Sequence, residues 1–131
     1  MKRIIFIVLT IMTTLSINAQ SEETLAEEKV YDVVEEIPQF PGGLSAMFDY
    51  LSKNIQYPET AEMNGFQGRV IVTFIVEKDG STSNAKVAKS AKPSLDEEAL
   101  RVVIAMPKWV SGKQNGKPVR VKYTVPVAFR L

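Results

Sequence analysis

Val-Arg-Val-Lys-Tyr-Thr-Val-Pro-Val-Ala-Phe-Arg-Leu, residues 119–131, is the stretch that decides the fold. Every odd position is apolar, whereas Arg120, Lys122 and Arg130 lie at even positions. This period-two alternation predicts a β-strand with one buried face and one solvent-facing face. Because Pro126 has no backbone N–H, we expect the strand to lie at a sheet edge or to pair incompletely there. Such an edge can accept a strand from another protein.

Composition limits the chemistry that the chain can carry. The sequence contains neither His nor Cys, which excludes Ser-His and Cys-His nucleophile pairs and the usual zinc sites. The Ser-x-x-Lys spacing of Ser83 and Lys86 falls on a predicted strand, where it does not bring the two groups together. Asp96-Glu97-Glu98 suits the positive end of a helix. We therefore predict no enzymatic activity, no catalytic residue, no metal, no cofactor and no small-molecule substrate.

Nucleic acid is not an expected partner either. Binding of single strands combines basic residues with exposed aromatic rings. On the closing strand the basic residues lie on one face, and Tyr123 and Phe129 lie on the other.

The N-terminus has the pattern of an export signal. Lys2-Arg3 precedes a short apolar run that ends with small residues at Ala19. This pattern predicts a cleavable signal peptide over residues 1–19 and a periplasmic location. The run is shorter than the roughly 18 residues of a membrane-spanning helix, although an uncleaved inner-membrane anchor is the alternative.

Turn and helix signals divide the rest of the chain. Residues 20–39 form an acidic leader, with a possible short strand over residues 30–37. Apolar spacing predicts a helix over residues 43–53, and Pro58 suits the first position of another. Residues 68–77 are apolar on both faces, which predicts a central strand covered on both sides. Asp79-Gly80 predicts a hairpin with a primed turn, and residues 81–89 form the returning strand.

A second clear helix follows the hairpin. Ser94 and Glu97 have the spacing of a capping box at its start. Its apolar stripe consists of Leu95, Ala99, Val102, Val103 and Met106. Pro107 ends the helix, and Trp109 is expected to anchor the core. These elements predict the α+β class: two helices packed on one face of a small, three-stranded antiparallel sheet, in one domain over residues 40–131.

Several short motifs follow one another along the chain. They are Phe40-Pro41-Gly42-Gly43, Tyr57-Pro58 with Ala61, Gly68-Arg69-Val70, Asp79-Gly80, Ser94-Leu95-Asp96 with Glu98-Ala99, Met106-Pro107-Lys108-Trp109, Gly116-Lys117-Pro118-Val119 and Phe129-Arg130-Leu131. Together they resemble the C-terminal domain of the TonB energy-transducing proteins, in the form common among Bacteroidetes. The resemblance covers residues 40–131.

The resemblance implies binding rather than catalysis. In that family the domain takes up the TonB box, a short N-terminal segment of an outer-membrane TonB-dependent transporter, as a strand beside its last strand. Carried over to this chain, the partner-binding residues are Asn54, Gln56, Tyr57, Pro58, Val119, Arg120, Val121, Lys122, Tyr123, Thr124, Val125, Val127 and Phe129.

Two features separate this chain from a full transducer of that family. Such a protein has an uncleaved inner-membrane helix with a functional His and a long Pro-rich spacer. This chain has no His and no Pro before Pro38. We therefore expect a stand-alone exported domain that recognises a transporter and supports transport across the outer membrane. The alternative is a periplasmic module without energy transduction, which forms a homodimer through its C-terminal strand or competes with a transducer.

Overall fold

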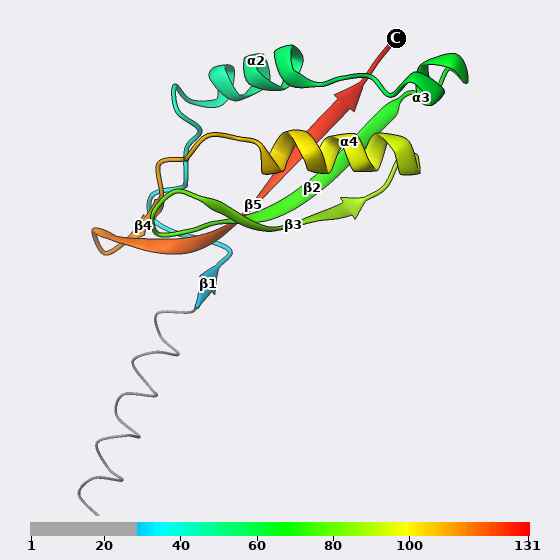
Figure 1. Ribbon diagram of the computed structural model, residues 1–131. Helices are drawn as coiled ribbons and strands as arrows, with labels where there is room; N and C mark the ends of the chain where they lie inside the picture. The colour runs from blue at the N-terminus through cyan, green and yellow to red at the C-terminus, as the bar shows by residue number, and fades with distance from the viewer. Residues whose placement is uncertain (1–28) are drawn as a thin grey trace, which may run out of the picture.

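A computed structural model describes residues 29–131 and is shown in Figure 1. The predicted signal peptide and residues 20–28 of the predicted leader lie outside the described residues. In chain order the elements are β1 (Val30–Tyr31), α2 (Leu44–Asn54), α3 (Glu59–Met63), β2 (Gly68–Val76), β3 (Thr82–Lys89), α4 (Pro93–Ile104), β4 (Gly112–Gln114) and β5 (Lys117–Phe129).

The sheet has β2 at its centre. The strand order is β1-β5-β2-β3, and β4 also pairs with β5. β2 is antiparallel to both β3 and β5, which confirms the three-stranded antiparallel sheet that the sequence predicts. β1 adds to β5 in parallel, and β4 forms a hairpin with β5 through Asn115 and Gly116. The short strand expected within residues 30–37 is therefore present over two residues.

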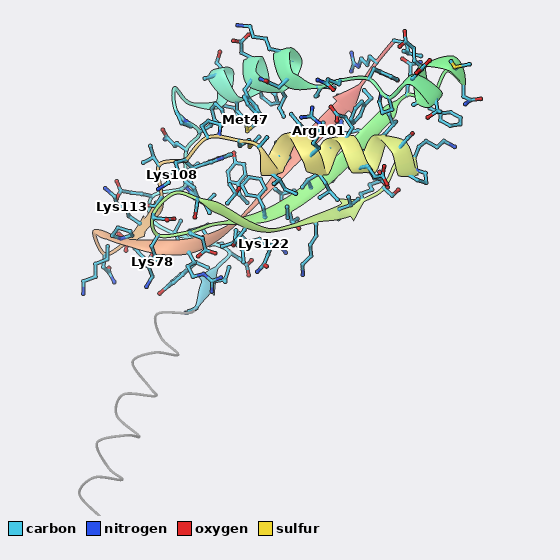
Figure 2. The ribbon with its side chains drawn as sticks, in the orientation of Figure 1. Met47, Lys78, Arg101, Lys108, Lys113 and Lys122 are labelled. Atoms are coloured by element: carbon cyan, nitrogen blue, oxygen red, sulfur yellow. The ribbon has the colours of Figure 1, made fainter. Side chains whose placement is uncertain are left out.

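The helices α2 and α4 lie on one face of the sheet, as Figure 1 shows. The strand residues that face them are buried: Val70, Val72, Phe74, Val76, Val121, Val125, Val127 and Phe129. Met47 points from α2 into the space between helix and sheet (Figure 2) and is 2% exposed. α4 contributes Leu95, Ala99, Val102 and Val103 of the predicted apolar stripe. The helix ends at Ile104, earlier than predicted, and Met106 is buried just beyond it. This layered α+β architecture confirms the predicted fold class.

The second face of β2 differs from the prediction. Its residues Ile71, Thr73 and Ile75 are half-buried, so the strand is not covered on both sides as its composition suggests. In the described part of the chain both long helices lie on the opposite face, and these β2 side chains are flanked by those of the neighbouring strands instead.

Two local predictions also need correction. The capping box is wrong, because α4 begins at Pro93 and Ser94 lies inside its first turn without a capping hydrogen bond. Asp96 holds the preceding loop instead, where it accepts hydrogen bonds from the Ala91 N–H at 3.0 Å and from the Ser90 hydroxyl. The β2–β3 hairpin is present, but the Gly80 N–H donates to the Glu77 carbonyl at 2.9 Å, which makes Lys78 and Asp79 the central residues of the turn. Neither has a positive φ, so the turn is not the primed type.

The Phe-Pro-Gly-Gly motif directs the chain into α2. The Gly43 N–H donates to the Phe40 carbonyl at 2.7 Å, with Pro41 and Gly42 at the centre of the turn. Gly42 has a φ of 88°, which is the conformation that a type II turn requires at this position. Phe40 is consequently buried, and its ring lies 5.7 Å from the ring of Trp109.

Candidate strand-docking site

One side of β5 is fully paired and most of the other side is not. β2 pairs with positions 121–129 of β5 through nine consecutive residue pairs without a register shift. On the opposite side of β5, β1 pairs with Arg120 and Val121 only. β4 pairs with positions 117–119. Within residues 29–131, no strand therefore pairs with that opposite side over positions 122–129.

Pro126 lies in the middle of this stretch, opposite Ile71 of β2. The ladder with β2 continues through it without interruption. A proline is tolerated inside a ladder where its nitrogen faces the unpaired side. We therefore expect Pro126 to remove one donor from the open side of β5, so that an added strand would pair most strongly before this position.

The side chains of β5 divide between two faces, as their alternation predicts. Val121, Val125, Val127 and Phe129 are at most 2% exposed, so a partner strand can reach only their backbone groups. Lys122 and Thr124 are exposed and lie on the other face, where they are paired with Ile75 and Thr73 of β2. Figure 2 shows Lys122 on the sheet, away from the helices.

Arg120 ties β5 to the end of β2. Its Nε lies 2.7 Å from Oε1 of Glu77, and its Nη2 lies 3.2 Å from Oε2. These hydrogen bonds from Arg120 lower the pKa of Glu77, against the opposing effect of partial burial. The ion pair therefore fixes the two strands where the open part of β5 begins.

An apolar pocket of about 200 Å³ lies beside the open part of β5. Tyr123 of β5 lines it together with Trp109 and with Leu44 and Met47 of α2. Residues 37–40 and Gly43 complete the wall. Tyr123 thus belongs both to the strand and to a pocket that could receive a side chain of an added strand.

The floor of this pocket is an aromatic cluster. The ring of Trp109 lies 4.8 Å from that of Tyr123 and 5.4 Å from that of Phe74. Trp109 is 4% exposed, which confirms its predicted place in the core. Because the rings come from different strands and from the loop after α4, their packing holds Tyr123 in a fixed position.

The predicted Tyr-Pro segment meets β5 through one residue. The ring of Tyr57 lies 5.8 Å from the ring of Phe129, and its hydroxyl donates to the Phe66 carbonyl. Asn54 and Gln56 are tied to α4 instead of to β5. The Asn54 carbonyl accepts a hydrogen bond from Arg101 at 2.9 Å, and the Gln56 N–H donates to Glu98 at 2.6 Å. Pro58 immediately precedes α3 and lines a surface hollow with residues of α4.

Glu98 is the buried charge that holds this segment. It is 8% exposed, and its carboxylate is 2.6 Å from Nε of Arg101 one turn further along α4. The hydrogen bond from Arg101 lowers the pKa of Glu98, and the Gln56 N–H acts in the same direction. Burial opposes both effects. Figure 2 shows Arg101 on α4, from which its guanidinium reaches the Asn54 carbonyl.

We expect Glu98→Gln to destabilise the fold at neutral pH by about 1–3 kcal/mol, because the ion pair with Arg101 and the charge-assisted bond from Gln56 are lost. The lowered pKa of Glu98 means that its contribution is complete above the ordinary pKa of a glutamate and disappears as the pH falls through its folded-state pKa. Urea unfolding of both proteins at about pH 7 and about pH 3 should therefore give a difference that shrinks in acid.

Glu97→Gln is the matched control for this experiment, because Glu97 is the exposed neighbour of Glu98 on the same helix. It should change the free energy of unfolding by less than about 0.5 kcal/mol at either pH. Equal effects of the two substitutions would contradict the role given to Glu98.

β3 is the other edge of the sheet, and it is built differently. Its ladder with β2 contains two register shifts, and Asn84 has a φ of 49°. Lys86 and Lys89 project from it into solvent. Bulges are a common means of protecting an edge from another strand. The regular ladder of β5 lacks such irregularities, so β5 is the better template for strand addition.

Within residues 29–131, no group of three or more acidic residues lies close enough together to hold a metal ion. No helix in that part of the chain has the length and apolar character needed to cross a bilayer.

Comparison with known proteins agrees with this architecture. Residues 53–131 match the family model described as the Gram-negative bacterial TonB protein C-terminal. The chain belongs to the TonB C-terminal domain family. The family match includes α3, α4 and β2–β5, and therefore the whole open stretch of β5.

Individual TonB proteins show the same relationship. Protein TonB of Pasteurella multocida is 32% identical over 87 residues, which is 66% of this chain and 33% of that protein. Protein TonB of Helicobacter pylori strain J99 is 32% identical over 80 residues, or 61% of this chain and 27% of that protein. The chain thus spans about a third of the length of these curated relatives.

A solved structure has a related fold. The solution NMR structure of the Helicobacter pylori TonB-CTD superimposes with a TM-score of 0.51 and 26% sequence identity. The match covers 65% of this chain and 77% of that chain.

Sequence reasoning missed three parts of this site. β1 lies on β5 itself, the pocket beside Tyr123 is walled by residues 37–40, and Glu98 is buried under residues 54–56. The apolar character of Ile37 and Leu44 was a signal for the pocket. The Glu98 to Arg101 spacing was a signal for the ion pair, because residues three apart are neighbours on a helix.

Proposed function

We propose that this TonB-family domain acts in the periplasm by taking up an N-terminal strand of an outer-membrane TonB-dependent transporter, the TonB box, and so supports transport across the outer membrane. The observation that carries the proposal is the open side of β5 at positions 122–129, which has no paired strand among residues 29–131. Strand addition there would give affinity through main-chain hydrogen bonds.

The surroundings of β5 indicate the chemistry of the strand that it would accept. Neighbouring strands place paired residues on the same face, about 5 Å apart. A residue opposite Tyr123 would therefore point toward the apolar pocket. A residue opposite Lys122 would lie on the exposed face, where a carboxylate would be favoured. The expected partner strand alternates apolar and acidic or polar residues.

The proposal is tested by titrating the isotope-labelled protein with N-terminal peptides of TonB-dependent transporters from the source bacterium. We expect the amide signals of positions 122–125 of β5 to shift, because the backbone groups on this open side would become paired. The amides of β3 serve as an internal control, since this second edge is bulged and should not respond. A peptide that shifts β3 and leaves β5 unchanged would overturn the proposal.

A matched pair of charge reversals sharpens this test. Lys122→Glu should weaken binding of an acidic peptide by about tenfold, because an opposite charge becomes a like charge across the strand pair. Lys86→Glu places the same change on β3, also in the row of exposed side chains away from the helices, and should leave the affinity unchanged. Equal effects would mean that overall charge attracts the peptide, and would count against docking on β5.

The same open strand could pair with a second copy of the chain. Sedimentation of the protein without peptide distinguishes the two possibilities. A monomer that binds transporter peptides fits the proposal. A dimer whose mass does not change with peptide, together with unchanged β5 signals, would favour self-assembly instead.

A further inference from the structure

The chain already places a strand of its own on the proposed docking side of β5. β1 lies on the side opposite β2, and Val30 and Tyr31 pair in parallel with Arg120 and Val121. Val30 also lines a hollow on the exposed face of the sheet beside Lys122. The leader therefore occupies Arg120 and Val121, the two positions of β5 directly before the open stretch at 122–129.

The hold of β1 on β5 is limited. Val30 and Tyr31 are only half-buried, and neither belongs to the hydrophobic core. After Tyr31 the chain turns away from β5, and the Glu35 N–H donates to Oε1 of Gln114 at 3.0 Å. Backbone hydrogen bonds then join Glu36 to Lys113 of β4 at 3.1 and 2.9 Å. This anchor on β4 keeps β1 next to β5 without contributing to their pairing.

We propose that β1 is an intramolecular competitor for the docking side of β5, so that a partner strand that extends to Arg120 must displace it. The inference rests on the proposed function, because it concerns the same strand and the same partner. One backbone edge can pair with one strand at a time. Residues 30–31 and the partner residues opposite Arg120 and Val121 therefore exclude each other.

This competition has two consequences. The apparent affinity for a partner is reduced by the fraction of molecules in which β1 occupies β5. By linkage, a bound partner also weakens the attachment of β1 to the domain. Partner binding would thus detach β1 from β5, while the anchor at Glu36 keeps β1 close to the site.

The absence of cysteine from the sequence allows a clean test with a disulfide lock. Val30→Cys combined with Arg120→Cys places two thiols on directly paired residues. Neighbouring strands are about 4.8 Å apart, which is within the Cα separation that a disulfide accepts. The oxidised and reduced forms of this variant differ only in the disulfide that holds β1 on β5. Val30→Cys alone controls for the oxidant.

Deletion of residues 29–31 provides the opposite change, because it removes β1 without touching the core. Each form is titrated with the transporter peptide that shifts β5. We expect the oxidised double variant to bind at least about tenfold more weakly than its reduced form, and the deletion to bind about threefold to tenfold more tightly than the parent chain.

The results of these titrations distinguish a failure of the proposed competition by β1 from a failure of the proposed function. If the oxidised and reduced forms bind equally and the deletion binds like the parent, β1 does not compete and the inference is overturned, while the proposed function stands. Failure of the paired cysteines to oxidise would overturn it as well, because β1 would not then occupy β5. If no form binds any transporter peptide, including the deletion, the proposed function fails and the competition fails with it.

Discussion

Gly80→Ala is expected to lower the free energy of unfolding by about 3 kcal/mol or more. Gly80 lies at the tip of the β2–β3 hairpin with a φ of 88°, a region that alanine rarely adopts. A methyl group there would lie 2.0 Å from the Trp109 carbonyl oxygen, which is far inside contact distance. The Trp109 N–H also donates to the Gly80 carbonyl at 2.8 Å, so neither segment can withdraw without losing a hydrogen bond.

Gly116→Ala is the matched control. Gly116 lies in the β4–β5 hairpin with a φ of 76°, but a methyl group there would meet no atom within 4 Å. Only the backbone conformation is penalised, at about 1–2 kcal/mol. Urea unfolding followed by tryptophan fluorescence compares the two variants. A Gly80→Ala loss no larger than that of Gly116→Ala would show that the contact with Trp109 does not constrain the hairpin.

The sequence predicts the central sheet and both long helices because their signals are local. The alternation over residues 119–131 and the apolar stripe of α4 each need only one face of one element to be buried. Asp79-Gly80 predicts a hairpin for the same reason, since a turn depends on its own backbone angles. The primed turn type was nevertheless wrong, and local signals could not predict the contact of Gly80 with Trp109, which joins residues 29 positions apart.

The arrangement around β5 was less predictable. Pro126 indicates an incompletely paired strand, and β5 is open over positions 122–129 in the described part of the chain. The placement of β1 beside Arg120 could not be predicted, because two residues carry no usable periodicity. In the sequence, Glu98 is typical of the acidic start of a helix. Its burial follows from the position of residues 54–56 over α4, which only the tertiary structure provides.

Trp109→Ala should be the most destabilising change at the candidate site. We expect a loss of about 3–5 kcal/mol, since the cavity would open among Phe40, Phe74 and Tyr123. That loss is comparable with the whole stability of a small domain, so much of the protein would unfold. Because Trp109 is the single tryptophan of the chain, unfolding of this variant must be followed by circular dichroism.

Trp109→Phe separates packing from hydrogen bonding. The indole N–H is buried and has no hydrogen-bond partner among residues 29–131. Phenylalanine keeps an aromatic ring in the cluster and removes this donor, whose burial costs about 1–3 kcal/mol. The benefit offsets part of the lost volume, and we expect a net loss below about 1.5 kcal/mol. Val110→Ala, at the exposed neighbouring residue, should stay within about 0.5 kcal/mol of the parent.

The two Trp109 variants also test how the core supports the site. If aromatic packing holds Tyr123 against the pocket, the phenylalanine variant should keep its transporter-peptide affinity within about threefold, because Tyr123 retains a ring beside it. The folded fraction of the alanine variant should bind more weakly, because the pocket floor is lost. A phenylalanine variant as unstable as the alanine variant would contradict this account, since the indole N–H rather than the ring would then stabilise the fold.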